Sequence, residues 1–187
     1  MRIISGAKKG KKILLPDPLI TRPLKDNVKE NIFNILIHSR SLNINFENTK
    51  VIDFFAGSGS FGIECISRGS KNVKFIEKDP KTTNTLYRNL SNNFEEKKYE
   101  IIKKDFFLID KEHLIKTYNP NILFFDPPYK IDKLNKIIEF INSLSKFKHL
   151  IIILHVEKKI NINFVNFKYC SERVYGLSKI YILKTNS

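Results

Sequence analysis

From residue 50 onward, short apolar runs alternate with longer amphipathic segments. The apolar runs have the length of strands and predict strands at residues 51–55, 73–77, 100–103, 122–125 and 150–156. The segments between and after them predict helices at residues 60–68, 80–93, 111–118 and 133–145. Strands that alternate with helices favour an α/β fold with a mostly parallel sheet and helices on both faces.

The two ends of the chain depart from this alternation. At the N-terminus, β-prone residues 2–4 and 11–15 flank a basic, glycine-bearing link, which predicts a small hairpin. A helix is expected at residues 27–38, with Asp26 as its N-cap. At the C-terminus, two strand-like runs at residues 164–174 and 179–184 have no helix between them and predict an antiparallel hairpin. We therefore expect an N-terminal region of residues 1–45 and an α/β domain of residues 46–187 whose sheet has seven strands.

A glycine-rich turn follows the first strand of the α/β domain. Gly57, Gly59 and Gly62 satisfy the GxGxxG spacing, and Glu77 ends the next predicted strand. Glycines let the backbone approach a nucleotide, and an acid after the second strand can bind ribose hydroxyls, so the loop alone is compatible with NAD, FAD or S-adenosylmethionine. Asp53, near the expected place of a methionine ammonium, and Asp105, near an adenine amine, favour S-adenosylmethionine. The candidate cofactor-binding residues are Asp53, Gly57, Ser58, Gly59, Glu77 and Asp105.

The candidate catalytic segment is Asp126-Pro127-Pro128-Tyr129, at the carboxyl end of a buried-type strand. Ligands of open α/β sheets bind at that end. The Asp126 carboxylate and the Pro127 carbonyl can accept both N–H bonds of an exocyclic base amine, which turns its lone pair towards a methyl donor. Prolines add no N–H donors, and Tyr129 offers a ring on which the base can stack.

Other residue types narrow the chemistry. Phe54, Phe55, Phe124 and Phe125 lie within the predicted strands and are expected to fill the sheet core. The two cysteines form no CxxC pair and the four histidines are scattered, so we expect no metal site. The longest apolar runs are far shorter than a membrane span, and the first residues do not resemble a signal peptide. We expect a cytoplasmic monomer.

The net charge of +14 and the pI near 9.7 point to a polyanionic partner. An abundance of isoleucine, lysine and asparagine, as AT-rich genomes encode, offers a competing explanation for the lysines. Several basic residues nevertheless gather before the α/β domain. The candidate residues for contact with a nucleic acid are Arg2, Lys8, Lys9, Lys11, Lys12, Arg22, Lys25 and Lys29.

Over nearly its whole length the sequence resembles the bacterial 16S ribosomal RNA guanine-N2 methyltransferases of the Rossmann-like class I superfamily. The resemblance rests on residues 2–6, 8–11, 22–23, 26–30, 33–34, 54–59, 76–79 and 126–129, and at the C-terminus on Glu172, Tyr175, Gly176 and the last strand. It implies S-adenosylmethionine as cofactor, with the sites named above, and 16S ribosomal RNA or a small-subunit assembly particle as partner. Leu24 and Asn27 depart from the family pattern, which has threonine and arginine there.

Three other functions stay open at this stage. A DNA adenine-N6 methyltransferase can also use Asp-Pro-Pro-Tyr, although 187 residues leave no room for a separate target-recognition region. A nicotinamide oxidoreductase fits the glycine loop but gives residues 126–129 no role. A non-catalytic RNA-binding domain would not need an intact glycine loop beside an intact Asp126 segment.

Overall fold

The computed structural model describes residues 1–16, 24–129 and 131–186. Its strands are β1 (Lys50–Phe54), β2 (Asn72–Ile76), β3 (Tyr99–Ile102), β4 (Ile122–Phe125), β5 (Ile151–Glu157), β6 (Tyr169–Tyr175) and β7 (Ser178–Lys184). Its α-helices are α1 (Asp26–His38), α2 (Ser60–Ser67), α3 (Pro80–Ser91), α4 (Lys111–Tyr118) and α5 (Leu134–Ser143). Three short 3₁₀ helices lie at Glu96–Lys98, Phe106–Leu108 and Leu144–Lys146.

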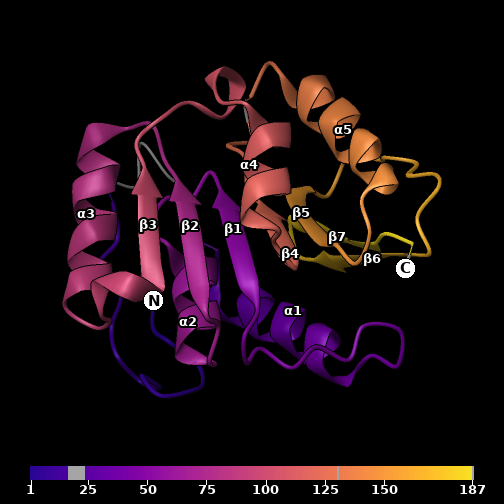
Figure 1. The fold of residues 1–187 in the computed structure, drawn as a ribbon. Helices are drawn as coiled ribbons and strands as arrows, with labels where there is room; N and C mark the ends of the chain where they lie inside the picture. Colours follow the sequence, from indigo (N-terminus) through magenta and orange to yellow (C-terminus); the bar gives the residue numbers. More distant parts are fainter. Residues whose placement is uncertain (17–23, 130, 187) are drawn as a thin grey trace.

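The strands form one seven-stranded sheet in the order β3-β2-β1-β4-β5-β7-β6. The five strands from β3 to β5 are parallel, whereas β7 runs antiparallel to β5 and β6 runs antiparallel to β7 (Figure 1). This confirms the predicted parallel sheet with a closing C-terminal hairpin. The order reverses direction between β1 and β4, and at such a switch point the loops diverge and leave a crevice at the carboxyl ends of the strands.

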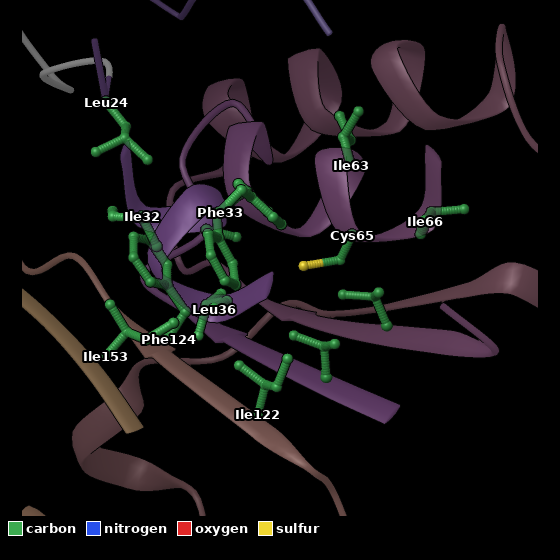
Figure 2. Packing of buried hydrophobic residues seen from close by; sticks show 14 of the residues in the cluster. Leu24, Ile32, Phe33, Leu36, Ile63, Cys65, Ile66, Ile122, Phe124 and Ile153 are labelled. Atoms are coloured by element: carbon green, nitrogen blue, oxygen red, sulfur yellow. The ribbon is translucent and has the colours of Figure 1, made fainter. Parts of the chain in front are cut away.

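Two apolar layers hold the helices on the sheet. One layer joins α1, α2 and α3 to one face, through side chains such as Phe33, Phe61 and Phe124. Figure 2 shows part of this cluster, with Phe33 and Phe124 labelled. Phe61 stacks on both of these rings, and its ring centroid lies 5.1 Å from that of Phe33 and 4.0 Å from that of Phe124. The other layer joins α4 and α5 to the opposite face, where Ile137 and Ile141 are fully buried. Burial on both faces explains why the parallel strands are continuously apolar.

The N-terminal region packs into the first of these layers, through Ile3, Ile13 and Leu24. The predicted hairpin is present as antiparallel pairing around an isolated bridge between Arg2 and Lys12 rather than as two full strands. Gly6 adopts φ +81° and lies so close to the Ser67 carbonyl that a Cβ atom would overlap it. The N-terminal hairpin is therefore anchored on the C-terminal end of α2.

Helix α1 begins one residue earlier than predicted. Asp26 is its first residue rather than its N-cap, and the N-cap Lys25 makes no side-chain capping hydrogen bond. Among the described residues, no helix is both long and apolar enough to cross a membrane.

Candidate functional site

A cavity of about 430 Å³ lies at the carboxyl ends of the parallel strands. Most of the predicted site residues line it, although they are far apart in the sequence. These are Asp53, Gly57, Ser58, Glu77, Asp105, Asp126, Pro127, Pro128 and Tyr129. The volume is in the range of small-molecule and cofactor sites. The structure thus brings the glycine loop and the Asp126 segment to one cavity, while the contacts they make with ligands stay predictions.

Asp53 differs from the other acids of the cavity wall because its side chain is fully buried and only one of its two carboxyl oxygens has a hydrogen-bond partner among the described residues. Its Oδ2 accepts from the Gly62 backbone N–H at 3.0 Å, whereas its Oδ1 has no partner among the described residues. Burial raises the pKa of the Asp53 carboxyl well above its usual value, and the nearby Asp126 and Glu77 raise it further. An orphaned buried carboxylate oxygen is suited to a cationic ligand group such as an ammonium.

The same carboxylate occupies the amino-terminal end of α2. Gly62 is the third residue of that helix, so Asp53 takes one of the N–H donors that a bound phosphate would otherwise use. A dinucleotide pyrophosphate placed here would meet a carboxylate of its own charge sign. The site therefore favours a cofactor without phosphate and stands against the nicotinamide alternative.

Glu77 lies beyond β2 and is held from both sides by backbone donors. Its Oε2 accepts from the Gly57 N–H at 2.9 Å and its Oε1 accepts from the Asp79 N–H at 2.9 Å. A carboxylate has about four acceptor positions, so both oxygens can still bind hydroxyl donors. This arrangement suits a pair of ribose hydroxyls.

The far part of the wall combines apolar surface with another acid. Ile76, Phe106 and Phe107 line it and offer a surface for a purine ring. Asp105 caps the short helix at Phe106–Leu108, because its Oδ1 accepts from the Phe107 N–H, and its Oδ2 pairs with Lys78 Nζ at 3.0 Å. The described residues of the whole wall contribute six carboxylates (Asp53, Glu77, Asp79, Asp105, Asp126 and Asp132) and three lysines (Lys78, Lys104 and Lys133). An acidic cavity in a protein of net charge +14 suits a cofactor with a positive sulfonium and ammonium.

Two residues differ from their predicted roles. Gly59 does not line the cavity. It packs against α3 instead, so closely that a Cβ atom on Gly59 would lie 2.4 Å from Leu86 Cδ1. With φ +78°, Gly59 allows the turn into α2 to pack closely against α3. Phe55 is not in the sheet core: it follows β1 with φ +63°, is half-buried and lines the cavity. The difference at Phe55 arises because β1 ends at Phe54, one residue earlier than the apolar run suggests.

The predicted RNA-binding residues fall into three groups. Arg2, Lys9, Lys11, Lys12 and Lys25 are exposed, and Lys8 is half-buried. Arg22 lies outside the described residues. The prediction for Lys29 is wrong in this structure, because its side chain is fully buried. Lys29 Nζ donates to the Arg2 carbonyl at 2.7 Å and to Ser60 Oγ at 3.1 Å, and it lies 3.8 Å from Glu64 Oε2. It holds α1, α2 and the N-terminal hairpin together and is not available to a phosphate.

Sequence reasoning missed two residues that contact the Asp126 segment. His155 Nδ1 lies 2.8 Å from Asp126 Oδ1, and His155 Nε2 lies 3.1 Å from the Tyr129 hydroxyl. Ser178, the first residue of β7, lies 3.1 Å from the same hydroxyl. A signal for His155 was present, since it is the one polar residue in the run from Leu150 to Val156 and stands at the strand's carboxyl end. Among the described residues there is no cluster of three potential metal ligands.

The sheet order, the acidic cavity and the loop contacts define the class: this is a Rossmann-like class I methyltransferase, and its cofactor is S-adenosylmethionine. The chain belongs to the family described as Conserved hypothetical protein 95, whose model matches residues 1–184.

Named relatives cover most of the chain. It is 33% identical over 161 residues to the ribosomal RNA small subunit methyltransferase D of Buchnera aphidicola, covering 84% of this chain and 78% of that protein. The protein of the same name from Haemophilus influenzae is 29% identical over 180 residues, covering 95% of this chain and 90% of the relative. In fold, the chain is similar to a hypothetical protein of Thermus thermophilus, with a TM-score of 0.80 at 20% identity and 99% of each chain covered.

Proposed function

We propose that this protein methylates the exocyclic N2 amine of a guanine in 16S ribosomal RNA, within the small subunit or a particle that assembles into it. The observation that carries the proposal is the position of Asp126, whose carboxylate lines the same cavity as Asp53 and Glu77. The proposed cofactor-binding groups and the proposed acceptor for the amine therefore line one cavity, which supports the proposal. The names of the relatives support ribosomal RNA as the substrate.

The chemistry requires little from the protein beyond positioning. S-adenosylmethionine supplies an electrophilic methyl group at its sulfonium. Asp126 and the Pro127 carbonyl accept the two amine N–H bonds, which leaves the nitrogen lone pair directed at that methyl. The nitrogen would take the methyl group as its bond to the sulfonium breaks, S-adenosylhomocysteine would leave as the neutral thioether, and the Asp126 carboxylate is placed to accept the proton that the nitrogen must lose. Tyr129 is half-buried beside this segment and provides a surface for the target base.

The N-terminal region reaches this cavity at Pro16 and Leu24 and also carries exposed basic residues. Pro16 and Leu24 line the cavity, whereas the Lys8 backbone N–H donates to Ser67 Oγ at the C-terminal end of α2, so the basic residues extend from near the cavity towards the far end of this helix. We propose that this basic surface, formed by Arg2, Lys8, Lys9, Lys11, Lys12 and Lys25, binds RNA phosphates. Phosphate contacts position a nucleic acid without reading its sequence. On this proposal residues 1–45 serve as an RNA-contacting extension of the methyltransferase domain at residues 46–187.

The proposal is tested with small ribosomal subunits from an Escherichia coli strain that lacks its own small subunit methyltransferase D. After incubation with the purified protein and S-adenosylmethionine, nucleoside analysis of the RNA should reveal N2-methylguanosine. Asp126→Ala should reduce turnover by roughly 100-fold, with S-adenosylhomocysteine affinity unchanged, because the lost acceptor acts mainly in the transition state. The appearance of N6-methyladenosine instead, or full turnover by Asp126→Ala, would contradict the proposal.

A further inference from the structure

Four side chains from three parts of the sheet form a continuous chain of hydrogen bonds at one wall of the cavity. Asp126 follows β4, Tyr129 follows three residues later, His155 lies in β5, and Ser178 begins β7. The contacts run from Asp126 Oδ1 to His155 Nδ1, from His155 Nε2 to the Tyr129 hydroxyl, and from that hydroxyl to Ser178 Oγ, at 2.8, 3.1 and 3.1 Å. His155 and Ser178 are both buried.

The chemistry of the four side chains determines which atom donates and which accepts in each of these hydrogen bonds. An ionised carboxylate can only accept, so the proton of a neutral imidazole lies on Nδ1 of His155. Nε2 then carries a lone pair and accepts from the Tyr129 O–H. The Tyr129 oxygen in turn accepts from the Ser178 O–H. Every donor in the chain thus has an acceptor when His155 is in its neutral Nδ1–H form.

This arrangement leaves one oxygen of Asp126 for a ligand. His155 donates to Oδ1, and no hydrogen bond to Asp126 Oδ2 is found among the described residues. We propose that His155, fixed by Tyr129 and Ser178, is a positioning residue that sets the rotation of the Asp126 carboxylate so that Oδ2 meets the target amine. The inference rests on the proposed function, because that function gives Asp126 its contact with the amine.

The surroundings of His155 argue against a role in packing alone. Its neighbours in β5, from Ile151 to Leu154 and at Val156, are all buried and apolar. An imidazole in such a strand costs free energy of desolvation unless both nitrogens are bonded. Parallel pairing puts His155 directly beside Asp126, one residue beyond the Phe125–Leu154 pair. The one polar residue between Ile151 and Val156 is therefore placed where it meets the Asp126 carboxylate.

The same histidine also holds the proposed base platform. Its ring lies edge-on to the Tyr129 ring, with centroids 5.7 Å apart and planes inclined at 74°. The hydrogen bond to the Tyr129 hydroxyl fixes that ring relative to the Asp126 carboxylate. A base stacked on Tyr129 would thus be held in a constant relation to the group that accepts its amine.

The main test replaces His155 in two ways and uses the ribosomal subunits described above as substrate. His155→Leu removes both hydrogen bonds and should lower kcat by about 10-fold or more, with S-adenosylhomocysteine affinity unchanged. His155→Asn puts an amide N–H near the place of Nδ1 and should restore most of kcat. In Asp126→Ala, adding His155→Leu should reduce kcat no further, because His155 acts through Asp126.

Two further measurements keep the test decisive if His155→Leu fails to fold. Tyr129→Phe keeps the ring but loses the hydroxyl and should lower kcat by about threefold or more. The matched control is Tyr181→Phe, since the Tyr181 hydroxyl is also hydrogen-bonded, to Ile162 N–H and the Ile160 carbonyl, and Tyr181 is not part of the cavity wall. Nitrogen NMR of labelled histidine should place the His155 proton on Nδ1 in the native protein and not in Asp126→Ala.

The outcomes separate this inference from the proposed function. If His155→Leu and Tyr129→Phe both turn over within twofold of the native protein while Asp126→Ala is inactive, the positioning role of His155 is wrong and the function stands. If Asp126→Ala is active, the proposed function fails and the role of His155 fails with it. A His155 proton found on Nε2 alone would also overturn the inference, because Nδ1 would then be unable to donate to Asp126.

Discussion

Replacing Asp53 by asparagine should affect the stability of the protein and its cofactor affinity in opposite directions. Asp53 is 1% exposed and its Oδ1 has no partner among the described residues. An asparagine oxygen can still accept from the Gly62 N–H, so the helix contact survives the change. What is lost is a buried negative charge that only a bound cation would compensate.

The size of both effects follows from that single charge. The asparagine amide would itself lack a partner where Oδ1 lies, so the gain comes from the buried charge alone: with Asp53 ionised and no ligand bound, Asp53→Asn should be more stable by about 1–3 kcal/mol. For a chain of this length each kcal/mol raises Tm by about 2–4 °C. A hydrogen bond to a charged partner contributes about 1.5–3 kcal/mol. S-adenosylhomocysteine, which carries the same ammonium, should therefore bind roughly 10- to 150-fold more weakly.

Both effects, on the free energy of unfolding and on S-adenosylhomocysteine affinity, should also depend on pH. Because burial raises the pKa of Asp53, the group stabilises the fold below its unfolded pKa, and this contribution is lost as pH rises through the raised value. The stability advantage of Asp53→Asn should thus grow with pH and vanish in acid. Affinity of the native protein for S-adenosylhomocysteine should rise over the same interval, since the carboxylate must ionise to bind the ammonium. The variant should lack this rise.

Thermal unfolding and calorimetric titration with S-adenosylhomocysteine, each repeated across pH, measure both effects. A suitable control is Asp110→Asn, because Asp110 also accepts from a helix N–H but caps α4 and does not line the cavity. Unchanged affinity in Asp53→Asn would refute the assignment of the ammonium to Asp53. A loss of stability instead of a gain would refute the argument that the carboxylate is uncompensated without ligand.

Three further predictions concern the framework around the site. Gly59→Ala should destabilise the protein by about 2–4 kcal/mol in chemical denaturation, whereas Gly10→Ala, at a similar φ but with open space, should cost only about 1 kcal/mol. Lys29→Met should cost roughly 3 kcal/mol because it leaves Glu64 buried without one of its cations, and equal stability would contradict the buried ion pair. Removing four surface lysines should flatten the slope of log affinity for RNA against log salt by roughly 3 without changing S-adenosylhomocysteine binding; an unchanged slope would place the RNA surface elsewhere. The four changes in that variant are Lys8→Ala, Lys9→Ala, Lys11→Ala and Lys12→Ala.

Periodicity and local motifs were enough to predict the sheet, its closing hairpin and most of the cavity wall. The reason is that parallel strands end at one edge, so residues that follow them, such as Glu77 and Asp126, must converge. The role of His155 depends on which strand lies beside β4, and no local pattern specifies that neighbour. Lys29 was misplaced for a related reason: a lysine on a helix is usually solvated. Its spacing with Phe33 and Leu36, which are both buried, nevertheless places it on the packed face.

Within the N-terminal region, the residues that attach it to the α/β domain, such as Lys29, differ from the exposed lysines that we propose bind RNA. Backbone and buried groups tie this region to the glycine loop: Lys29 Nζ joins the Arg2 carbonyl to Ser60, and the Asn89 amide donates to both the Leu14 and Ser58 carbonyls. None of these contacts uses the exposed lysine side chains. Charge on the surface can therefore change, through lysine or arginine, without moving the loop that lines the cofactor cavity. Conversely, a rigid attachment fixes the basic surface relative to Asp126, so that RNA held by its phosphates would meet an amine site already in place.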